Sequence, residues 1–177
     1  MTVLPHNELV ASAEPLEETK VPFLWSLKDH SKNALPSGFL EKTKKQGKIV
    51  GWAPQTQVLA HESVVVFVTH CGANSVYEGV AMGVPLIGRP FFADQRMVGR
   101  LVESIWKDGL QVEGGKFTKS GLVKSLKLIL EEENEQGKRI REGAKALKEL
   151  VLKADHGPDS IAVRDMKTLV SLISTTS

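Results

Sequence analysis

Three residues near the middle of the chain could together bind an anion. Gly72 lies in the turn that ends an apolar, β-branched run, and Asn74 and Ser75 come next at the expected start of a helix. Gly72 allows a ligand to approach the backbone closely. The free amides and the dipole at a helix start attract negative charge. These residue types, in this order, predict a site for a phosphorylated ligand.

The elements that must position these residues form a strand, helix and strand unit. Val64 to Thr69 is expected to be a strand, Val76 to Met82 a short helix, and Val84 to Ile87 the next strand. A continuous apolar run bounded by turn residues is typical of a strand buried on both faces of a parallel sheet. The polar turn therefore lies at the carboxyl edge of that sheet, where doubly wound folds bind ligands.

Strands and helices alternate through the rest of the chain, which favours an α/β fold. Phe23 to Leu27 and Lys48 to Val50 are expected strands, and Thr118 is expected to cap the first of the carboxyl-terminal amphipathic helices. Near the amino end, the helix that includes Leu9 is expected to kink or end early at Pro15. An interior proline loses one backbone hydrogen bond and costs roughly 3 kcal/mol.

Composition excludes several classes of protein. The 177 residues, of which 41% are apolar, can bury one ordinary core, so a single domain is expected. The formal charge of +2 is spread thinly, so nucleic-acid binding is not expected. The one cysteine, Cys71, fits a reducing compartment and is read as a small buried side chain. No apolar run is long enough to span a membrane and the amino end lacks a signal-peptide core, so the expected location is cytoplasmic.

Simple structural roles compete with a functional reading of the polar residues. Ser75 and Glu78 have the spacing of a capping box, in which the carboxylate merely satisfies a backbone amide. His70 could be a core histidine bonded to a carbonyl, and Trp52 could be a packing residue. Asp94 could simply cap a helix. Spacing alone leaves these alternatives open.

The stretch from Trp52 to Gln95 resembles the nucleotide-sugar-binding signature of plant UDP-dependent glycosyltransferases. The similarity includes WAPQ, the pair HE, THCG followed by NS, Glu78, GVPLI and the closing DQ. The flanking segments LPSGFLEKT, RPFFADQ and VEGGKFTKSGL most resemble the flavonoid and anthocyanidin 3-O-glucosyltransferases. The resemblance makes residues 1–177 the carboxyl-terminal, donor-binding domain of a GT-B enzyme. Its signature spans 52–95, and its last helices span about 118–175.

The resemblance implies a Rossmann-like parallel sheet with helices on both faces. The family places a strand immediately before the segment that matches Thr2 to Leu4, and that first strand is central in the Rossmann order. This first central strand is expected to be missing from the chain. The strands from Phe23 to Leu27 and from Val64 to Thr69 would then lack the partner between them. Unpaired apolar strand edges favour pairing with another chain, so self-association is expected.

The resemblance also assigns a donor-binding set. Trp52 would stack on the uracil, whose edge the backbone of Ala53 and Gln55 would meet, and Glu78 would bind both ribose hydroxyls. The full set is Ser26, Trp52, Ala53, Gln55, His70, Gly72, Ala73, Asn74, Ser75, Glu78, Asp94 and Gln95.

The remaining members of this set would bind the diphosphate and the sugar. His70, Asn74 and Ser75 would hold the diphosphate and stabilise charge as UDP leaves. Asp94 and Gln95 would bind the sugar hydroxyls, and Gln95 favours glucose over galactose. Ser26 would be a further nucleotide contact. The family usually has a tryptophan where this chain has Ala73, so one indole contact is lost while the backbone amide remains.

The family's general base, a histidine, belongs to the amino-terminal domain along with most of the acceptor pocket. The resemblance therefore implies an inverting UDP-glycosyltransferase, or hexosyltransferase, that needs no cofactor and no metal. It would transfer glucose to a flavonoid 3-hydroxyl only with that other domain, so no catalytic residue is expected here and the chain alone is expected to be inactive. The alternative is a non-catalytic UDP-sugar-binding or interaction module. A Rossmann oxidoreductase is disfavoured because no G-x-G-x-x-G follows a strand.

Overall fold

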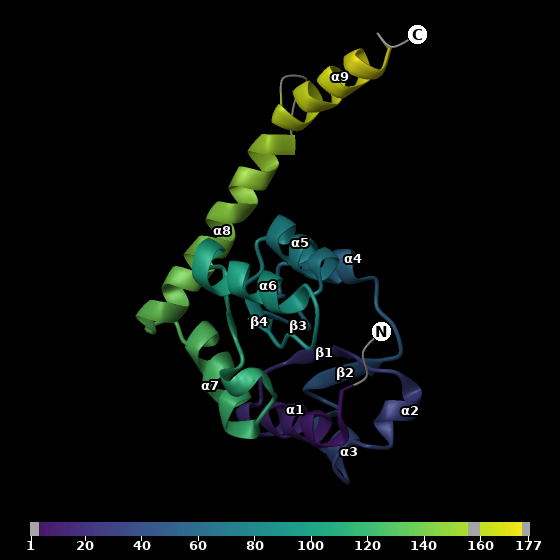
Figure 1. Cartoon of the computed structure of the whole chain (residues 1–177). Helices are drawn as coiled ribbons and strands as arrows, with labels where there is room; N and C mark the ends of the chain where they lie inside the picture. Colours follow the sequence, from purple (N-terminus) through teal and green to yellow (C-terminus); the bar gives the residue numbers. More distant parts are fainter. Residues whose placement is uncertain (1–3, 156–159, 175–177) are drawn as a thin grey trace.

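The computed structural model describes residues 4–155 and 160–174, which form an α/β fold with two parallel sheets (Figure 1). The two-stranded sheet has the order β1-β2, and the three-stranded sheet has the order β3-β4-β5. The strands are β1 Phe23–Ser26, β2 Gly47–Val50, β3 Phe67–Thr69, β4 Leu86–Gly88 and β5 Gly109–Gln111.

Helices connect successive strands, as parallel pairing requires. Those before β4 are α1 His6–Thr19, α2 Asp29–Lys32, α3 Phe39–Thr43, α4 Gln55–Leu59 and α5 Ala73–Met82. After β4 come α6 Gln95–Arg100, the π-helix η1 Leu101–Trp106, the 3₁₀ helix η2 Glu113–Gly115, α7 Lys119–Leu130, α8 Glu135–Asp155 and α9 Ile161–Ser174. None of these helices, within the described part of the chain, is long and apolar enough to cross a membrane.

The two sheets are separate in their backbone hydrogen bonding. β1 pairs with β2 from Phe23 opposite Gly47 onward, and β3 pairs with β4 from Phe67 opposite Leu86 onward. Among residues 4–155 and 160–174, no strand pairing joins β1 to β3. This agrees with the expectation that these two strands lack a partner between them. Residues 1–3, which include the beginning of the segment expected to follow the missing strand, are outside the described part.

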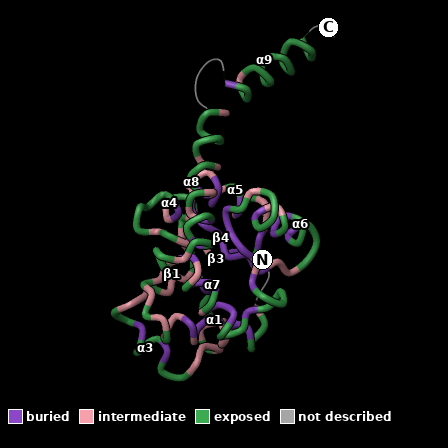
Figure 2. Tube along the Cα trace, turned by 90° about the vertical axis from the view of Figure 1, so that its left-hand side faces the viewer, coloured by how far each residue is buried: buried purple, intermediate pink, exposed green. Residues whose placement is uncertain are grey.

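The three-stranded sheet is covered by helices on both faces because its central strand presents apolar side chains to both. Leu86 and Ile87 are consecutive in β4, so they point to opposite faces, and both are fully buried. Ile87 belongs to a cluster with residues of β5, α7, α8 and the segment between β5 and α7 (Leu110, Val112, Phe117, Leu122, Leu126, Ile129 and Ile140). Leu86 belongs to a second cluster with residues of α5, α6, η1 and the turn before α5 (Cys71, Val76, Val80, Val98 and Val102). Figure 2 shows this burial around β4, in contrast to the exposed α9.

Two expectations about local structure were wrong. The strand expected from Val64 begins only at Phe67, and it is not buried on both faces, since Val68 is 40% exposed. The reason is that β3 is an edge strand, whereas the central β4 is the doubly buried one. The early end expected at Pro15 was also wrong, because helix α1 continues to Thr19. Its buried face, which includes Leu9 and the fully buried Pro15, offsets the lost hydrogen bond.

The carboxyl-terminal helices form as expected. The Thr118 side chain accepts a hydrogen bond from the Gly121 amide at 3.1 Å, which caps α7. Helix α8 packs against both α5 and α7, and α9 extends from its far end away from the sheets (Figure 1).

Candidate functional site

A hollow of about 400 Å³ lies at the carboxyl ends of β3 and β4. It is lined by His70, Gly72, Ala73, Asn74, Ser75 and Asp94. His70 directly follows β3, and Asp94 ends the loop that follows β4. Five of the six lining residues lie between His70 and Ser75 in the sequence, and folding brings Asp94 to the same place. The hollow is therefore at the edge of the sheet that the sequence predicts for a ligand.

The floor of this hollow is the first turn of α5. The helix begins at Ala73 after Gly72, and the first bond of its main-chain ladder runs from the Val76 amide to the Gly72 carbonyl. The amides of Ala73, Asn74 and Ser75 precede that bond, so the helix itself supplies no acceptor for them. Such amides and the positive end of the helix dipole suit a phosphate group.

Gly72 is required because the His70 imidazole lies against it. A Cβ atom at Gly72 would lie 2.3 Å from His70 Nε2. The residue between them, Cys71, is buried and has a positive φ of 61°. A Cβ at Gly88 of β4 would likewise lie 2.4 Å from Cys71 Sγ. Cys71 and Gly72 thus form a tight turn that packs against Gly88 of β4 and directs the imidazole toward the helix start.

The ionisation of His70 and Cys71 follows from this packing. Partial desolvation of the imidazole, which packs on the turn but stays open to the hollow, lowers the pKa of His70, and the negative charge of Asp94 opposes that shift. The imidazole is therefore neutral near pH 7, where one of its nitrogens can donate a hydrogen bond. Because His70 is exposed and lines the hollow, its reading as a core histidine was wrong. Burial raises the pKa of the Cys71 thiol to about 11, which fits its reading as an inert buried side chain.

Beside the hollow, Gln55 of α4 holds Glu78 of α5. The Gln55 side-chain amide donates to Glu78 Oε2 at 2.7 Å and to Ser75 Oγ at 3.1 Å. The capping-box reading was wrong, since Gly72 is the N-cap of α5 and no side chain caps the helix. Ser75 lies inside the helix, and the Glu78 carboxylate faces α4 rather than its own helix start. Among residues 4–155 and 160–174, no donor contacts Glu78 Oε1.

Trp52 is a surface residue at the approach to α4. Its side chain is 74% exposed, so its reading as a packing residue was wrong. Ala53 and Pro54 separate it from α4, which packs against α5. A large exposed indole three residues before Gln55 offers a flat apolar face on which a planar ring could stack.

The last two residues of the predicted set differ in exposure. Asp94 occupies the N-cap position of α6, so the helix start expected there is confirmed, but its side chain makes no cap bond. It is exposed and lines the hollow. Gln95 is only 7% exposed, and its Oε1 accepts bonds from the Phe91 and Phe92 amides at 2.9 and 3.4 Å. Its side chain therefore also stabilises the loop before it.

Ser26 is not part of this hollow. It ends β1 in the other sheet and is exposed. The sequence reasoning also missed Glu8 and Arg89, which form a buried ion pair next to the Asp94 loop. They are separated by 81 residues, and neither belongs to a recognisable motif. No signal in the sequence pairs them.

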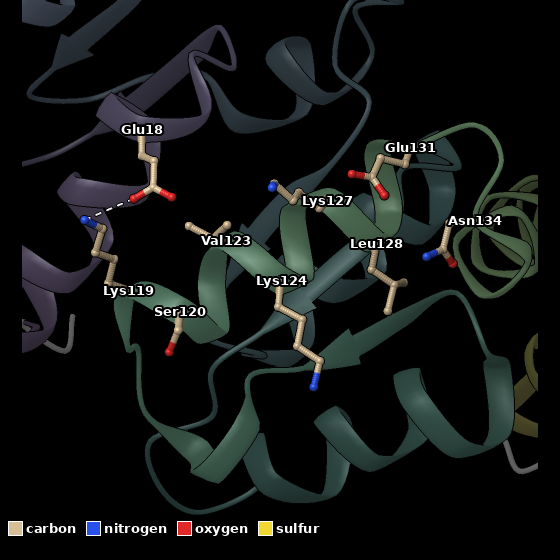
Figure 3. Close-up of a pocket in the computed structure, with 9 residues that line it drawn as sticks. All are labelled: Glu18, Lys119, Ser120, Val123, Lys124, Lys127, Leu128, Glu131 and Asn134. Carbon is tan, nitrogen blue, oxygen red and sulfur yellow. Dashed lines mark ion pairs between the residues drawn. The ribbon is translucent and has the colours of Figure 1, made fainter.

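A larger hollow of about 610 Å³, which His70 does not line, runs along α7 (Figure 3). Lys119 pairs with Glu18 at 3.0 Å, and Lys124 pairs with Glu113 at 3.4 Å. All four side chains are at least half exposed. This hollow is a solvated groove with paired charges, and its residues suggest no chemistry.

Comparison with known proteins agrees with this architecture. Residues 1–141 match the family described as "UDP-glucoronosyl and UDP-glucosyl transferase", and the chain belongs to that family. It is 52% identical over 98% of its length to an anthocyanidin 3-O-glucosyltransferase from Vitis vinifera, of which it spans 38%. It is 55% identical over 87% of its length to one from Solanum melongena, of which it spans 35%. A Rhododendron delavayi anthocyanidin 3-O-galactosyltransferase is similar to the same degree, with 51% identity over 96% of the chain.

Solved structures share the fold. The chain resembles a UDP-glucose:anthocyanidin 3-O-glucosyltransferase crystallised with UDP, with a TM-score of 0.94 and 51% identity. That match covers 99% of this chain and 39% of the other. Phytolacca americana UGT2, in complex with UDP-2fluoro-glucose and pterostilbene, matches with a TM-score of 0.88 and 29% identity over 97% of this chain and 39% of its own. The chain thus has the fold of these GT-B enzymes but spans little more than a third of their length.

Proposed function

We propose that this chain is the donor-binding half of an inverting, metal-independent UDP-glycosyltransferase that transfers glucose to the 3-hydroxyl of a flavonoid. The observation that carries the proposal is the hollow at the start of α5, where free helix amides, His70 and Asp94 meet beside the Gln55–Glu78 pair. The similarity to anthocyanidin glucosyltransferases supports both the donor and the acceptor class.

The uridine half of the donor would bind on the α4 side of the hollow. The exposed Trp52 indole stacks on the uracil, and the first-turn amides of α4 and the backbone of Ala53 meet its polar edge. Glu78 Oε1 accepts from the ribose hydroxyls while Gln55 holds Oε2. Ser26, at the end of β1, would contact the nucleotide from the other sheet.

The diphosphate would lie over the first turn of α5. The amides near Ala73, Asn74 and Ser75 neutralise its charge, and neutral His70 donates a hydrogen bond. These fixed donors become more effective as charge develops on the departing UDP. The sugar would then face Asp94, whose carboxylate accepts from its hydroxyls, and the amide nitrogen of Gln95.

Transfer needs groups beyond these donor contacts. An acceptor hydroxyl must lose its proton to a general base as it attacks the anomeric carbon opposite the leaving UDP. No donor-site residue is proposed for that task, and the chain spans only 35% and 38% of the two glucosyltransferases. The 177-residue chain alone is therefore proposed to bind the donor without forming a glycoside.

Calorimetry with UDP, UDP-glucose and UDP-galactose, followed by product analysis with a flavonol, tests this proposal. The chain should bind UDP weakly, prefer UDP-glucose to UDP-galactose, and form no product. Tighter binding of UDP-galactose would overturn the choice of sugar, and detectable transfer by the pure chain would overturn its proposed inactivity. Product formation after adding an amino-terminal half from a relative would separate an enzyme half from a non-catalytic binding module.

A further inference from the structure

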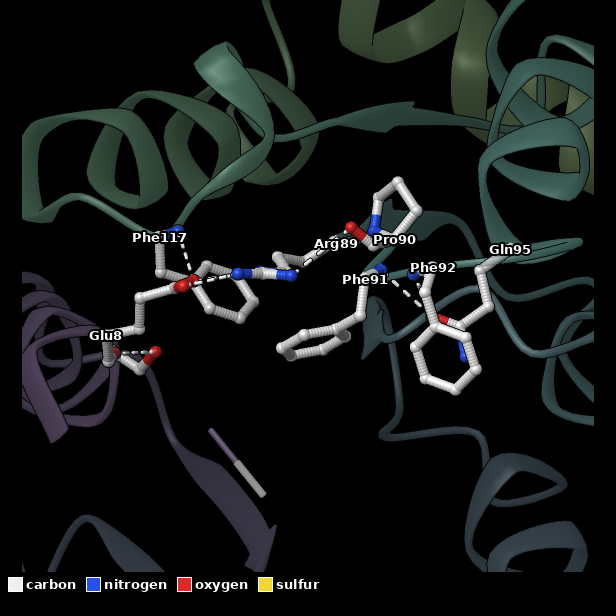
Figure 4. A network of polar contacts seen from close by, with 8 residues as sticks. Glu8, Arg89, Pro90, Phe91, Phe92, Gln95 and Phe117 are labelled. Atoms are coloured by element: carbon white, nitrogen blue, oxygen red, sulfur yellow. Dashed lines mark hydrogen bonds and ion pairs between the residues drawn. The ribbon is translucent and has the colours of Figure 1, made fainter. Parts of the chain in front are cut away.

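A buried ion pair joins helix α1 to the residue that opens the Asp94 loop (Figure 4). Arg89 Nε donates to Glu8 Oε2 at 2.8 Å, and the Arg89 Nη2 group donates to Glu8 Oε1. The Phe117 amide also donates to Glu8 Oε2, at 2.9 Å. Only 2% of Glu8 and 7% of Arg89 is exposed. This bidentate geometry compensates two charges that would otherwise be costly to bury.

The carboxylate is held in its charged form. Burial alone raises the pKa of Glu8, but the Arg89 hydrogen bond, the Phe117 amide and the Arg89 charge outweigh burial and bring the pKa below its usual value. The pair is therefore ionised at neutral pH, and it fixes the direction of the Arg89 guanidinium.

Arg89 contacts both segments that form the hollow. Its backbone amide donates to the Thr69 carbonyl at 2.8 Å, one residue before His70. Its guanidinium carbon lies 3.5 Å from the centre of the Phe91 ring, and Nη1 donates to the Pro90 carbonyl at 3.3 Å. A fixed guanidinium under an aromatic ring is a favourable cation–π contact. Arg89 thus supports the first half of the loop.

The second half of the loop contains a strained residue, and Gln95 supports the loop from its carboxyl end. Ala93 has a positive φ of 52°, a conformation that a residue with a Cβ rarely adopts. Such strain persists only where the surroundings impose it. Gln95 Oε1 accepts from the Phe91 and Phe92 amides, so Arg89 and Gln95 enclose the strained residue between two supports.

We propose that Arg89, oriented by Glu8, is a positioning residue for the sugar moiety of the donor, an inference that rests on the proposed function. The ion pair keeps the loop of residues 90–94 in its strained conformation and so keeps the Asp94 carboxylate at the rim of the hollow opposite His70. Trp52 and Glu78 come from other elements. Loosening the loop should therefore reduce binding of the sugar and spare binding of uridine.

The test compares the dissociation constants of UDP and UDP-glucose in two variants. Arg89→Met removes the support but also leaves Glu8 buried without its partner, which is strongly destabilising. Phe91→Leu keeps the ion pair and removes only the aromatic ring above it. We expect each variant to bind UDP-glucose about tenfold more weakly, and UDP less than about twofold more weakly.

Two control variants separate positioning from general stability. Lys119→Met removes an exposed ion pair between α1 and the start of α7, and Ile129→Val removes a methylene group from the core. Neither should change the ratio of the two dissociation constants. In a measurement without ligand, the pKa of His70 followed by nuclear magnetic resonance should fall in Phe91→Leu, because Asp94 then lies farther away, and stay unchanged in Lys119→Met.

The possible results are distinguishable. A tenfold loss confined to UDP-glucose, with a lower pKa of His70, supports the positioning role. Equal losses for UDP and UDP-glucose, or no loss for either, would overturn it while leaving the proposed function intact. If the wild-type chain bound neither UDP nor UDP-glucose, the proposed function would fail, and the inference would fail with it.

Discussion

Gln55 and Glu78 are joined by a 2.7 Å hydrogen bond between the Gln55 amide nitrogen and Glu78 Oε2. The bond links α4 to α5 and holds the carboxylate in one orientation before any ligand arrives. Side chains that are fixed in advance lose less entropy on binding. In the proposed function, this bond keeps the Glu78 carboxylate oriented for the ribose hydroxyls, although Glu78 does not line the hollow itself.

Replacing Glu78 by Ala should weaken UDP binding by about 1–3 kcal/mol, because a charge-assisted hydrogen bond is lost. The effect on the unfolding temperature should be small, since Glu78 caps no helix. Calorimetry and thermal denaturation measure the two effects. A lower unfolding temperature with unchanged UDP affinity would mean that Glu78 has a structural role only.

The Gln55→Ala variant should act on UDP affinity through Glu78. In a double-mutant cycle, the combined Gln55→Ala and Glu78→Ala variant should bind UDP about as well as Glu78→Ala alone. The coupling energy should lie in the range of about 0.5–3 kcal/mol that is typical of residues in contact. Strictly additive effects would show that Gln55 does not act by holding the carboxylate.

Trp52→Ala should weaken UDP binding by about 1–3 kcal/mol and change stability by less than about 0.5 kcal/mol. The reason is that an indole with 74% exposure contributes contact area to a bound ring but little to the core. Trp52→Phe should retain part of the affinity. If Trp52→Ala binds UDP like the wild type, the uracil must bind elsewhere.

Asp108 should make the protein more stable in mild acid than at neutral pH. Burial raises its pKa from 3.8 to about 6, and neither carboxylate oxygen has a hydrogen-bond partner among the described residues. The folded state therefore keeps the proton to a higher pH than the unfolded state does. Stability falls as pH rises from about 4 to about 6, and the full cost above that range is on the order of 3 kcal/mol.

Asp108→Asn tests this pH dependence directly. The variant should gain stability at pH 7 and gain little at pH 4, as measured by urea denaturation at both values. An equal gain at both pH values would indicate a change in packing rather than the loss of a buried charge. Glu8→Gln should behave in the opposite sense, because the pKa of Glu8 is lowered in the folded state and its stabilising contribution is lost in acid.

The unpaired strands should make the chain associate with itself. β1 and β3 have no pairing with one another within the described residues, and Leu24 and Val68 are 45% and 40% exposed. We expect sedimentation velocity to show species larger than a monomer at higher concentrations. Leu24→Lys should reduce this association, because lysine on an edge strand opposes pairing with another chain. A monomer at all concentrations would exclude association through these edges.

Features that depend on short stretches of sequence could be predicted. The turn from His70 to Ser75, the helix after it and the strand after that lie within one local unit, so residue order determines their relation. The Thr118 cap is also local, because the bond spans three residues. The signature from Trp52 to Gln95 then identified the family, since so long a pattern is specific.

Only the tertiary structure decided the contacts between distant residues. The Glu8–Arg89 pair spans 81 residues and the Gln55–Glu78 bond spans 23, and both depend on how helices pack on the sheet. Exposure also depends on neighbours, so Trp52 and Val68 differed from their local expectation, and packing of its buried face lets α1 continue through Pro15. The order of residues determines which groups are available, and packing determines which of them meet. The direction of a side chain toward a distant partner is set by that packing and not by local propensity.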